Sequence, residues 1–223
     1  MLQKSEKQLS QLQKQSSKMS FSLKKLVLLM VVVLSVSATS NAQLQYGVKA
    51  SAGATCQSDM LEIAKNCDVR FSPGIGLLAK YQFTDAFALK SGLEYLQKGR
   101  SYDENGSSLT NKLQYLNLPV KAEFSAGEKA GFKNGQRIYF AVGPYLSYLL
   151  DAKGELNDVS FDLQSDTKDF DFGLSYEIGF DFPVFNTKTL QVGLNYDMGF
   201  IEVYKSEPDL HNKMASISLG LLF

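Results

Sequence analysis

The chain has 223 residues, of which 44% are hydrophobic, with 15 Phe, 11 Tyr and no Trp. This composition is sufficient for one domain with a packed core and excludes a disordered chain. The formal charge of zero hides an asymmetry: residues 1–42 hold six lysines and one acid, whereas residues 43–223 hold 17 basic and 22 acidic residues, a net charge of −5. Because no basic stripe remains in 43–223, nucleic acid is not an expected partner.

The N-terminus has the order of a secretory signal peptide. Two lysines precede an apolar run at 26–36, and small residues then occupy positions −3 and −1 of a cleavage site between Ala42 and Gln43. The alternative is a transmembrane anchor, but eleven apolar residues are fewer than the roughly 20 that a helical span needs. We therefore expect residues 1–42 to be removed during export and residues 43–223 to form the domain.

The polar stretch 1–18 precedes a second methionine, Met19. Either it extends the basic region of the signal peptide, or translation begins at Met19.

Two cysteines, Cys56 and Cys67, stand eleven positions apart. Since an exported chain meets an oxidising compartment, we expect them to form a disulfide; the alternative is a pair of buried free thiols. Two cysteines and the single, distant His211 make a poor zinc site. Between the cysteines, Asp59 and Glu62 have the spacing of a short capped helical turn.

After Gln43 the sequence alternates between apolar and polar residues, the two-residue period of a β-strand. In 169–183, every even position from Phe170 to Phe182 is apolar, and the odd positions are Asp, Gly, Ser or Glu. This run is more than twice the usual strand length of about six residues. Eight such segments are predicted, at 46–54, 71–83, 87–98, 116–124, 138–150, 169–183, 190–200 and 215–223.

The connections predicted between these segments alternate in length. Those after the first, third, fifth and seventh segments are long, and those after the second and sixth are tight; the connection at 125–136 is the exception. Leu113 and Tyr115 have the opposite parity to the apolar residues of 116–124. This break predicts a bulge or a register change near Tyr115 and Leu116.

Three architectures use eight alternating strands: a soluble lipocalin-type barrel, a sandwich and an outer-membrane barrel, in which the apolar side faces lipid. Several segments run to 11–15 residues, where 9–11 suffice to cross a bilayer. Aromatic residues gather near strand ends, and glycine and charge fill the polar parity. The final residue, Phe223, resembles the terminal aromatic signal that outer-membrane assembly machinery reads. We therefore predict an eight-stranded antiparallel up-and-down outer-membrane barrel, with outer-membrane lipid and that machinery as partners.

Five stretches then resemble a known family: 92–99 (GLEYLQKG), 113–124 (LQYLNLPVKAEF), 142–150 (VGPYLSYLL), 171–182 (DFGLSYEIGFDF) and 194–200 (LNYDMGF). They are similar to the porin-family outer-membrane β-barrel proteins of the PorT-like kind. The most specific pieces are YLNLP at 115–119 and GPY at 143–145. The resemblance implies an eight-stranded barrel in the outer membrane and little about chemistry. One branch of the family is tied to protein secretion, but no residue here marks that branch.

A barrel of eight strands encloses a space just wide enough for side chains. Charged residues on the polar parity are therefore predicted to meet inside it, where they need partners of opposite charge. They can form either a salt-bridged plug, which we favour, or an ion path or proton relay. The predicted set is Lys49, Lys80, Lys90, Glu94, Lys98, Lys121, Glu123, Glu177, Asp181 and Asp197.

Signals for catalysis, metals or cofactors are weak. His211 stands in the last long connection, and its neighbours Glu207, Pro208 and Asp209 are typical of an exposed turn. No phosphate-binding glycine loop or paired metal ligands occur, so neither a cofactor nor a metal is expected. Five acids between the fifth and sixth segments fit no calcium loop and indicate an acidic surface: Asp151, Glu155, Asp158, Asp162 and Asp166.

Two functions remain, and a third, an outer-membrane enzyme, is only weakly supported. The first is a non-enzymatic outer-membrane barrel with a filled lumen, which has a structural role or binds a partner through its external loops. The second is a transport or protein-secretion component of the outer membrane.

Overall fold

The computed structural model describes residues 43–223 except 60–67, 105–106, 157–158, 186–187 and 207–208. The predicted signal peptide ending at Ala42, the helical turn ending at Glu62, and Cys67 lie outside the described residues. The cleavage site before Gln43 and the disulfide between Cys56 and Cys67 therefore remain predictions. Within the described part of the chain, no helix is both long and apolar enough to span a bilayer.

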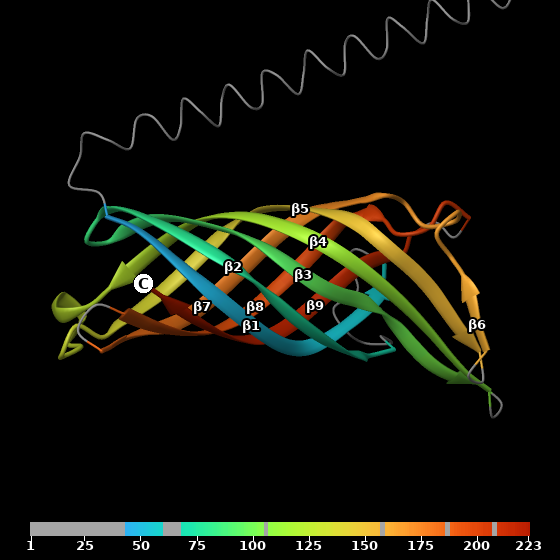
Figure 1. Cartoon of the computed structure of the whole chain (residues 1–223), viewed down its shortest axis with the longest axis horizontal. Helices are drawn as coiled ribbons and strands as arrows, with labels where there is room; N and C mark the ends of the chain where they lie inside the picture. Colours follow the sequence, from blue (N-terminus) through green and yellow to red (C-terminus); the bar gives the residue numbers. More distant parts are fainter. Residues whose placement is uncertain (1–42, 60–67, 105–106, 157–158, 186–187, 207–208) are drawn as a thin grey trace, which may run out of the picture. The chain divides into compact units, whose positions relative to one another are not determined.

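Eight long strands close into an antiparallel barrel (Figure 1). Neighbours in sequence pair around the ring, β5 pairs with β7, and β1 pairs with β9 to close it. This confirms the predicted eight-stranded fold. The strands are β1 (Gln43–Ser58), β2 (Arg70–Thr84), β3 (Phe87–Glu104), β4 (Ser107–Ala126), β5 (Arg137–Leu156), β7 (Phe170–Val184), β8 (Lys188–Glu202) and β9 (His211–Leu222).

Two short elements complete the described structure. β6 (Val159–Asp162) pairs only with the last four residues of β5, so it forms a hairpin outside the closed ring. The 3₁₀ helix η2 (Glu128–Ala130) lies in the connection between β4 and β5. The sequence pattern predicted neither element, because each is shorter than the window over which a period can be recognised.

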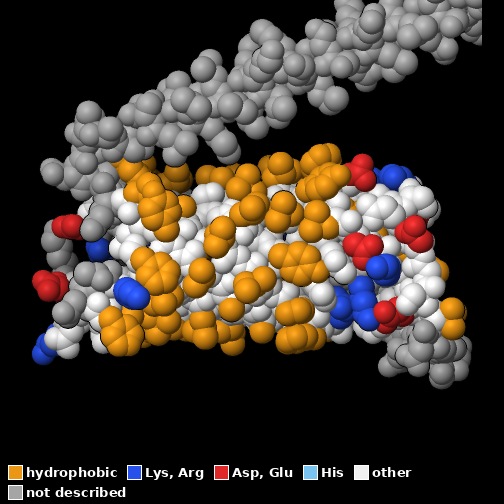
Figure 2. Space-filling model, viewed as in Figure 1, with side chains coloured by type: hydrophobic (Ala, Val, Ile, Leu, Met, Phe, Trp, Pro, Cys, Tyr) orange, Lys and Arg blue, Asp and Glu red, His pale blue; other side chains and the backbone are white. Residues whose placement is uncertain are grey.

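Apolar side chains cover the outside of the barrel. On β2, for example, Phe71, Ile75 and Leu77 are 61–66% exposed. Figure 2 shows the hydrophobic side chains spread over the middle of the visible face, with the charged ones toward its two ends. Because the charged residues of the same strands point inward and are buried, the arrangement is inverted relative to a soluble barrel. The outer surface therefore faces lipid.

Aromatic rings lie at both edges of this apolar band. On one side Tyr81, Phe83, Phe87 and Phe124 form a continuous row, with ring centroids 4.7–5.4 Å apart. On the other side, the ring of Tyr148 packs against that of Phe170 at 5.3 Å. Such girdles mark the two interfaces of a bilayer.

The two ends of the barrel differ. The terminal end carries Gln43, the connections at 85–86, 127–136 and 185–187, and Phe223, whose backbone N–H donates to the carbonyl of Tyr46 at 2.7 Å. The loop end carries the remaining connections, including the β5–β6 hairpin and residues 203–210.

β3, β4 and β5 extend farthest beyond the strand ends that the sequence pattern predicted at the loop end. β3 continues to Glu104 and β4 begins at Ser107, so the long connection expected between them is wrong; it spans only 105–106. β5 likewise continues to Leu156. In these extensions the sequence no longer alternates between apolar and polar residues, because outward-facing residues such as Lys112 and Lys153 are polar. The backbone hydrogen bonding between the strands nevertheless continues.

The predicted irregularity near Tyr115 is present in the β4–β5 pairing, where the register shifts between Gln114 and Tyr115. The extra residue, however, is Leu150 on β5, because Gln114 pairs with Asp151 and Tyr115 pairs with Leu149. β4 therefore keeps its parity, and the side chain of Tyr115 points into the barrel.

Candidate functional site

The interior of the barrel brings the predicted charged side chains together. All ten are buried and lie on the inward parity of their strands. Two charges buried together are stable only with good geometry and additional hydrogen bonds. The interior is organised in successive layers between the terminal end and the loop end.

The layer nearest the terminal end is centred on Lys80. Its ammonium forms ion pairs with Glu123 on β4 and with Asp181 on β7, the latter at 3.1 Å. Gln191 on β8 donates to the other carboxylate oxygen of Asp181 at 2.7 Å. One lysine thus links strands from both sides of the ring.

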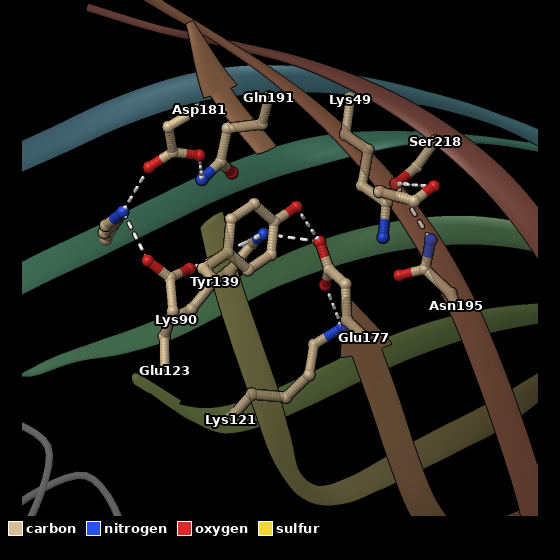
Figure 3. A network of polar contacts seen from close by, with 12 residues as sticks. Lys49, Lys90, Lys121, Glu123, Tyr139, Glu177, Asp181, Gln191, Asn195 and Ser218 are labelled. Atoms are coloured by element: carbon tan, nitrogen blue, oxygen red, sulfur yellow. Dashed lines mark hydrogen bonds and ion pairs between the residues drawn. The ribbon is translucent and has the colours of Figure 1, made fainter. Parts of the chain in front are cut away.

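The next layer is centred on Glu177, which is 2% exposed. Its Oε1 accepts hydrogen bonds from Lys90 Nζ and the hydroxyl of Tyr139, both at 2.7 Å, and its Oε2 accepts one from Lys121 Nζ at 2.5 Å. Figure 3 shows these three side chains converging on the carboxylate. Lys90 also lies 3.9 Å from Glu123, which connects this layer to the first.

The central layer contains two carboxylates in different settings. Glu94 pairs with Lys49 at 2.7 Å. Asp197 accepts a hydrogen bond from the hydroxyl of Ser175 at 2.5 Å, and among the described residues no ion pair involves it. A cavity of about 10 Å³ lies between these groups. That volume is room for about one water molecule.

The fourth layer was missed in part by sequence reasoning. Asp171 was not among the predicted charges, yet its Oδ2 forms an ion pair with Lys98 at 2.9 Å and accepts from Asn212 at 3.1 Å. The ammonium of Lys98 also lies 4.3 Å from the ring centroid of Tyr145, a cation–π geometry. The signal was available, since Asp171 has the same parity as Glu177 and Asp181.

The inward tyrosines fit the interior because glycines face them. Tyr139 pairs in register with Gly179, and Tyr145 pairs with Gly173. On β8, Gly193 and Gly199 pair with the same two glycines. A Cβ placed on Gly179 would lie 2.6 Å from the hydroxyl of Tyr139, so the glycine leaves the space that the ring fills.

An apolar cap lies at the loop end of the interior. It consists of buried side chains from β4, β5 and the connection after β8: Leu113, Tyr115, Leu149, Ala152, Val203 and Tyr204. Tyr204 is fixed on both sides, because its hydroxyl accepts from Asn111 at 2.8 Å and donates to Gln57 at 3.1 Å. Near this cap, the ammonium of Lys168 donates a hydrogen bond to the carboxylate of Glu202 at 2.7 Å. This hydrogen bond lowers the pKa of Glu202.

The placement of His211 in the last long connection was wrong, whereas Asp209, from the predicted turn before it, lies in a turn and is exposed. His211 is the first residue of β9, pairs in register with Glu202 and is 8% exposed. The chain after β8 folds inward at Val203 and Tyr204 instead of extending outward, and this brings His211 into the wall of the barrel.

The acidic connection predicted between the fifth and sixth segments is also partly wrong. Asp151 and Glu155 lie on β5, where they pair with Lys153 at 3.0 Å and Lys112 at 2.5 Å, and Asp162 ends β6. Asp166 lies in the connection that follows, and Asp158 lies outside the described residues. In the described part of the chain, no three His, Cys, Asp or Glu side chains gather as metal ligands.

The inverted barrel can be compared with known proteins. The family model of the outer membrane protein β-barrel domain matches residues 14–205. The chain belongs to this family. Its location is the outer membrane, and its apolar band is the surface that contacts lipid.

Solved structures of similar barrels support the fold of this outer-membrane protein. Neisserial surface protein A is 16% identical over 82% of this chain and all of that chain, with a TM-score of 0.51. OprG from Pseudomonas aeruginosa is 12% identical over 81% of this chain and 95% of that chain, with a TM-score of 0.50. No curated protein matches the sequence. At these identities the likeness extends to the fold alone.

Proposed function

We propose that this outer-membrane barrel is a non-enzymatic protein with a closed lumen, which acts through its loop end as a structural or partner-binding component of the envelope. The observation that carries the proposal is the interior itself. Four layers of charged and polar side chains occupy the space inside the strands, and the cavity in the central layer has a volume of about 10 Å³.

The paired charges favour closure over conduction. An ion that entered the lumen would have to displace a lysine from a buried carboxylate, as at Lys121 and Glu177, and leave a buried charge without its partner. Breaking a buried pair in this way costs several kcal/mol. The apolar cap adds a second barrier, because the side chains of Leu113 and Leu149 cannot replace the hydration shell of an ion.

The loop end is the part of the molecule that is free to meet a partner. β3, β4 and β5 rise beyond the aromatic girdle at Tyr148, and all four residues of β6 are exposed. Longer loops face outward in barrels of this kind, whereas short turns face the periplasm. We infer that the β5–β6 hairpin projects from the cell surface, with lipid and the barrel assembly machinery as the other partners.

The alternative is a transport or protein-secretion component of the outer membrane. It rests on the resemblance of YLNLP at 115–119 and GPY at 143–145 to PorT-like proteins. In the structure Pro119 and Tyr145 pair in register, so these two pieces lie side by side on β4 and β5. Their inward side chains belong to the barrel wall, which is compatible with either function.

Solute uptake separates the two functions. We expect liposomes that contain the refolded barrel to swell in neutral sugars no faster than protein-free liposomes. A swelling rate that rises in proportion to the amount of folded protein would instead establish transport. Protein that migrates as folded on a gel without boiling is the material to use, so that unfolded chains do not perturb the lipid.

A further inference from the structure

Two tyrosines lie side by side in the middle of the lipid-facing surface. Tyr176 on β7 and Tyr196 on β8 are register partners. Tyr176 stands six residues from Phe170 and six from Phe182, the first and last phenylalanines on the apolar face of its strand. At about 3.3 Å per residue and a tilt of 35–45°, each separation is roughly 15 Å along the membrane normal. A tyrosine side chain is too short to bring its hydroxyl from there to the headgroups.

Neither hydroxyl has a partner within the described part of the chain. Ser91 also has its hydroxyl on the lipid-facing side of a strand, but that hydroxyl donates a hydrogen bond to the carbonyl of Pro119 at 2.8 Å. Tyr95 and Tyr148 also face outward, but they lie toward the girdle at the loop end, where water is close. A polar group without a hydrogen bond in hydrocarbon is costly, because lipid tails offer neither donor nor acceptor.

A shallow groove lies on one side of this pair, and small side chains lie on the other. A shallow groove of about 190 Å³ runs beside the two tyrosines, lined by Phe140, Ile178 and Leu194. On the other side Tyr196 pairs in register with Ala215 on β9, which pairs with Ala54 on β1. Small side chains let a second protein surface approach closely in a membrane.

We propose that Tyr176 and Tyr196 are the centre of an interface between two copies of this chain in the membrane. Copies with the same orientation in one bilayer are related by a two-fold axis along the membrane normal, so each residue meets its counterpart at the same depth. The tyrosines of one copy then face those of the other, and each hydroxyl gains a donor or acceptor. A lipid chain in the groove cannot supply this at mid-membrane depth.

The test is energy transfer between donor- and acceptor-labelled full-length mature barrels in liposomes, measured as lipid dilutes the protein. We expect the wild type to associate reversibly. The double variant Tyr176→Phe/Tyr196→Phe keeps both rings and the groove, so we expect it to fold normally and to dissociate at a protein fraction at least tenfold higher. The matched control, Tyr95→Phe/Tyr148→Phe, removes two outward hydroxyls near the girdle and should associate as the wild type does.

Two results would overturn the proposal. One is a wild type that stays monomeric at every lipid ratio, in which case lipid or a different protein covers the groove. The other is a double variant that associates as tightly as the wild type, which would place the contact on another face. Gel migration without boiling confirms in each case that the variant is folded.

Discussion

Lys121 on β4 and Glu177 on β7 form an ion pair of 2.5 Å inside the barrel, although β5 lies between their strands. Lys90 completes the group at 2.7 Å from the same carboxylate. The variant Glu177→Gln keeps the shape and an acceptor for Tyr139 but removes the charge, so Lys121 loses its carboxylate partner and Lys90 keeps only Glu123, 3.9 Å away. We expect a loss of about 3 kcal/mol in the free energy of unfolding, as breaking buried pairs generally causes.

The measurement is urea unfolding in liposomes, followed by gel migration without boiling. Glu155→Gln is the matched control, because Glu155 pairs with Lys112 at 2.5 Å but both side chains are about one-third exposed. Exposed pairs contribute about 0–1 kcal/mol. Equal losses in the two variants would mean that the interior pair has no special role in stability.

Gly179 is predicted to be essential for the packing of Tyr139. In Gly179→Ala the new methyl group would clash with the backbone carbonyl of Val192 and would lie 2.6 Å from the ring and hydroxyl of Tyr139. Overpacking of this kind costs about 1–3 kcal/mol. The same unfolding assay measures it, and a variant as stable as the wild type would show that the ring can move aside.

The disulfide between Cys56 and Cys67 is expected to stabilise the barrel by about 2–3 kcal/mol through restriction of the unfolded loop. Mass spectrometry of unreduced, digested protein should find one linked peptide, and reduction should lower the urea midpoint. Alkylation of both thiols without prior reduction would contradict the pairing.

The loop end is predicted to lie outside the cell. Val159 on β6 is 69% exposed, whereas Gln136 lies in the connection at the terminal end. A cysteine placed at Val159 should react with a membrane-impermeant maleimide on intact cells, and one placed at Gln136 should react only after lysis. The reverse labelling pattern would invert the orientation.

The fold could be predicted because its determinant is local. The alternation along 169–183 and the seven similar segments determines which side chains share a face of each strand. The aromatic residues near the strand ends and the terminal Phe223 then indicate that the apolar face contacts lipid, not water. The interior positions of Lys80, Glu177 and Asp181 follow from the same parity. Their pairing partners do not, because they depend on which strands lie opposite across the lumen.

What the sequence did not predict lies where the alternation ends. β5 continues past Leu150 with polar residues facing outward, and the extra residue at Leu150 reverses its parity, so the strand end was interpreted as a connection. The apolar cap was missed for a related reason. Tyr115 and Leu149 are apolar residues on the polar parity, and they pack in one cluster with Val203 and Tyr204, where the chain after β8 folds inward.

The central claim, a lumen closed by paired charges and an apolar cap, is tested most directly by single-channel conductance in planar bilayers. The folded wild-type barrel should give no steady current at moderate voltage, with at most rare and brief openings, because paired charged side chains occupy the narrow lumen of an eight-stranded barrel. A stable conductance that scales with the number of inserted barrels would contradict the closed lumen and favour the transport alternative.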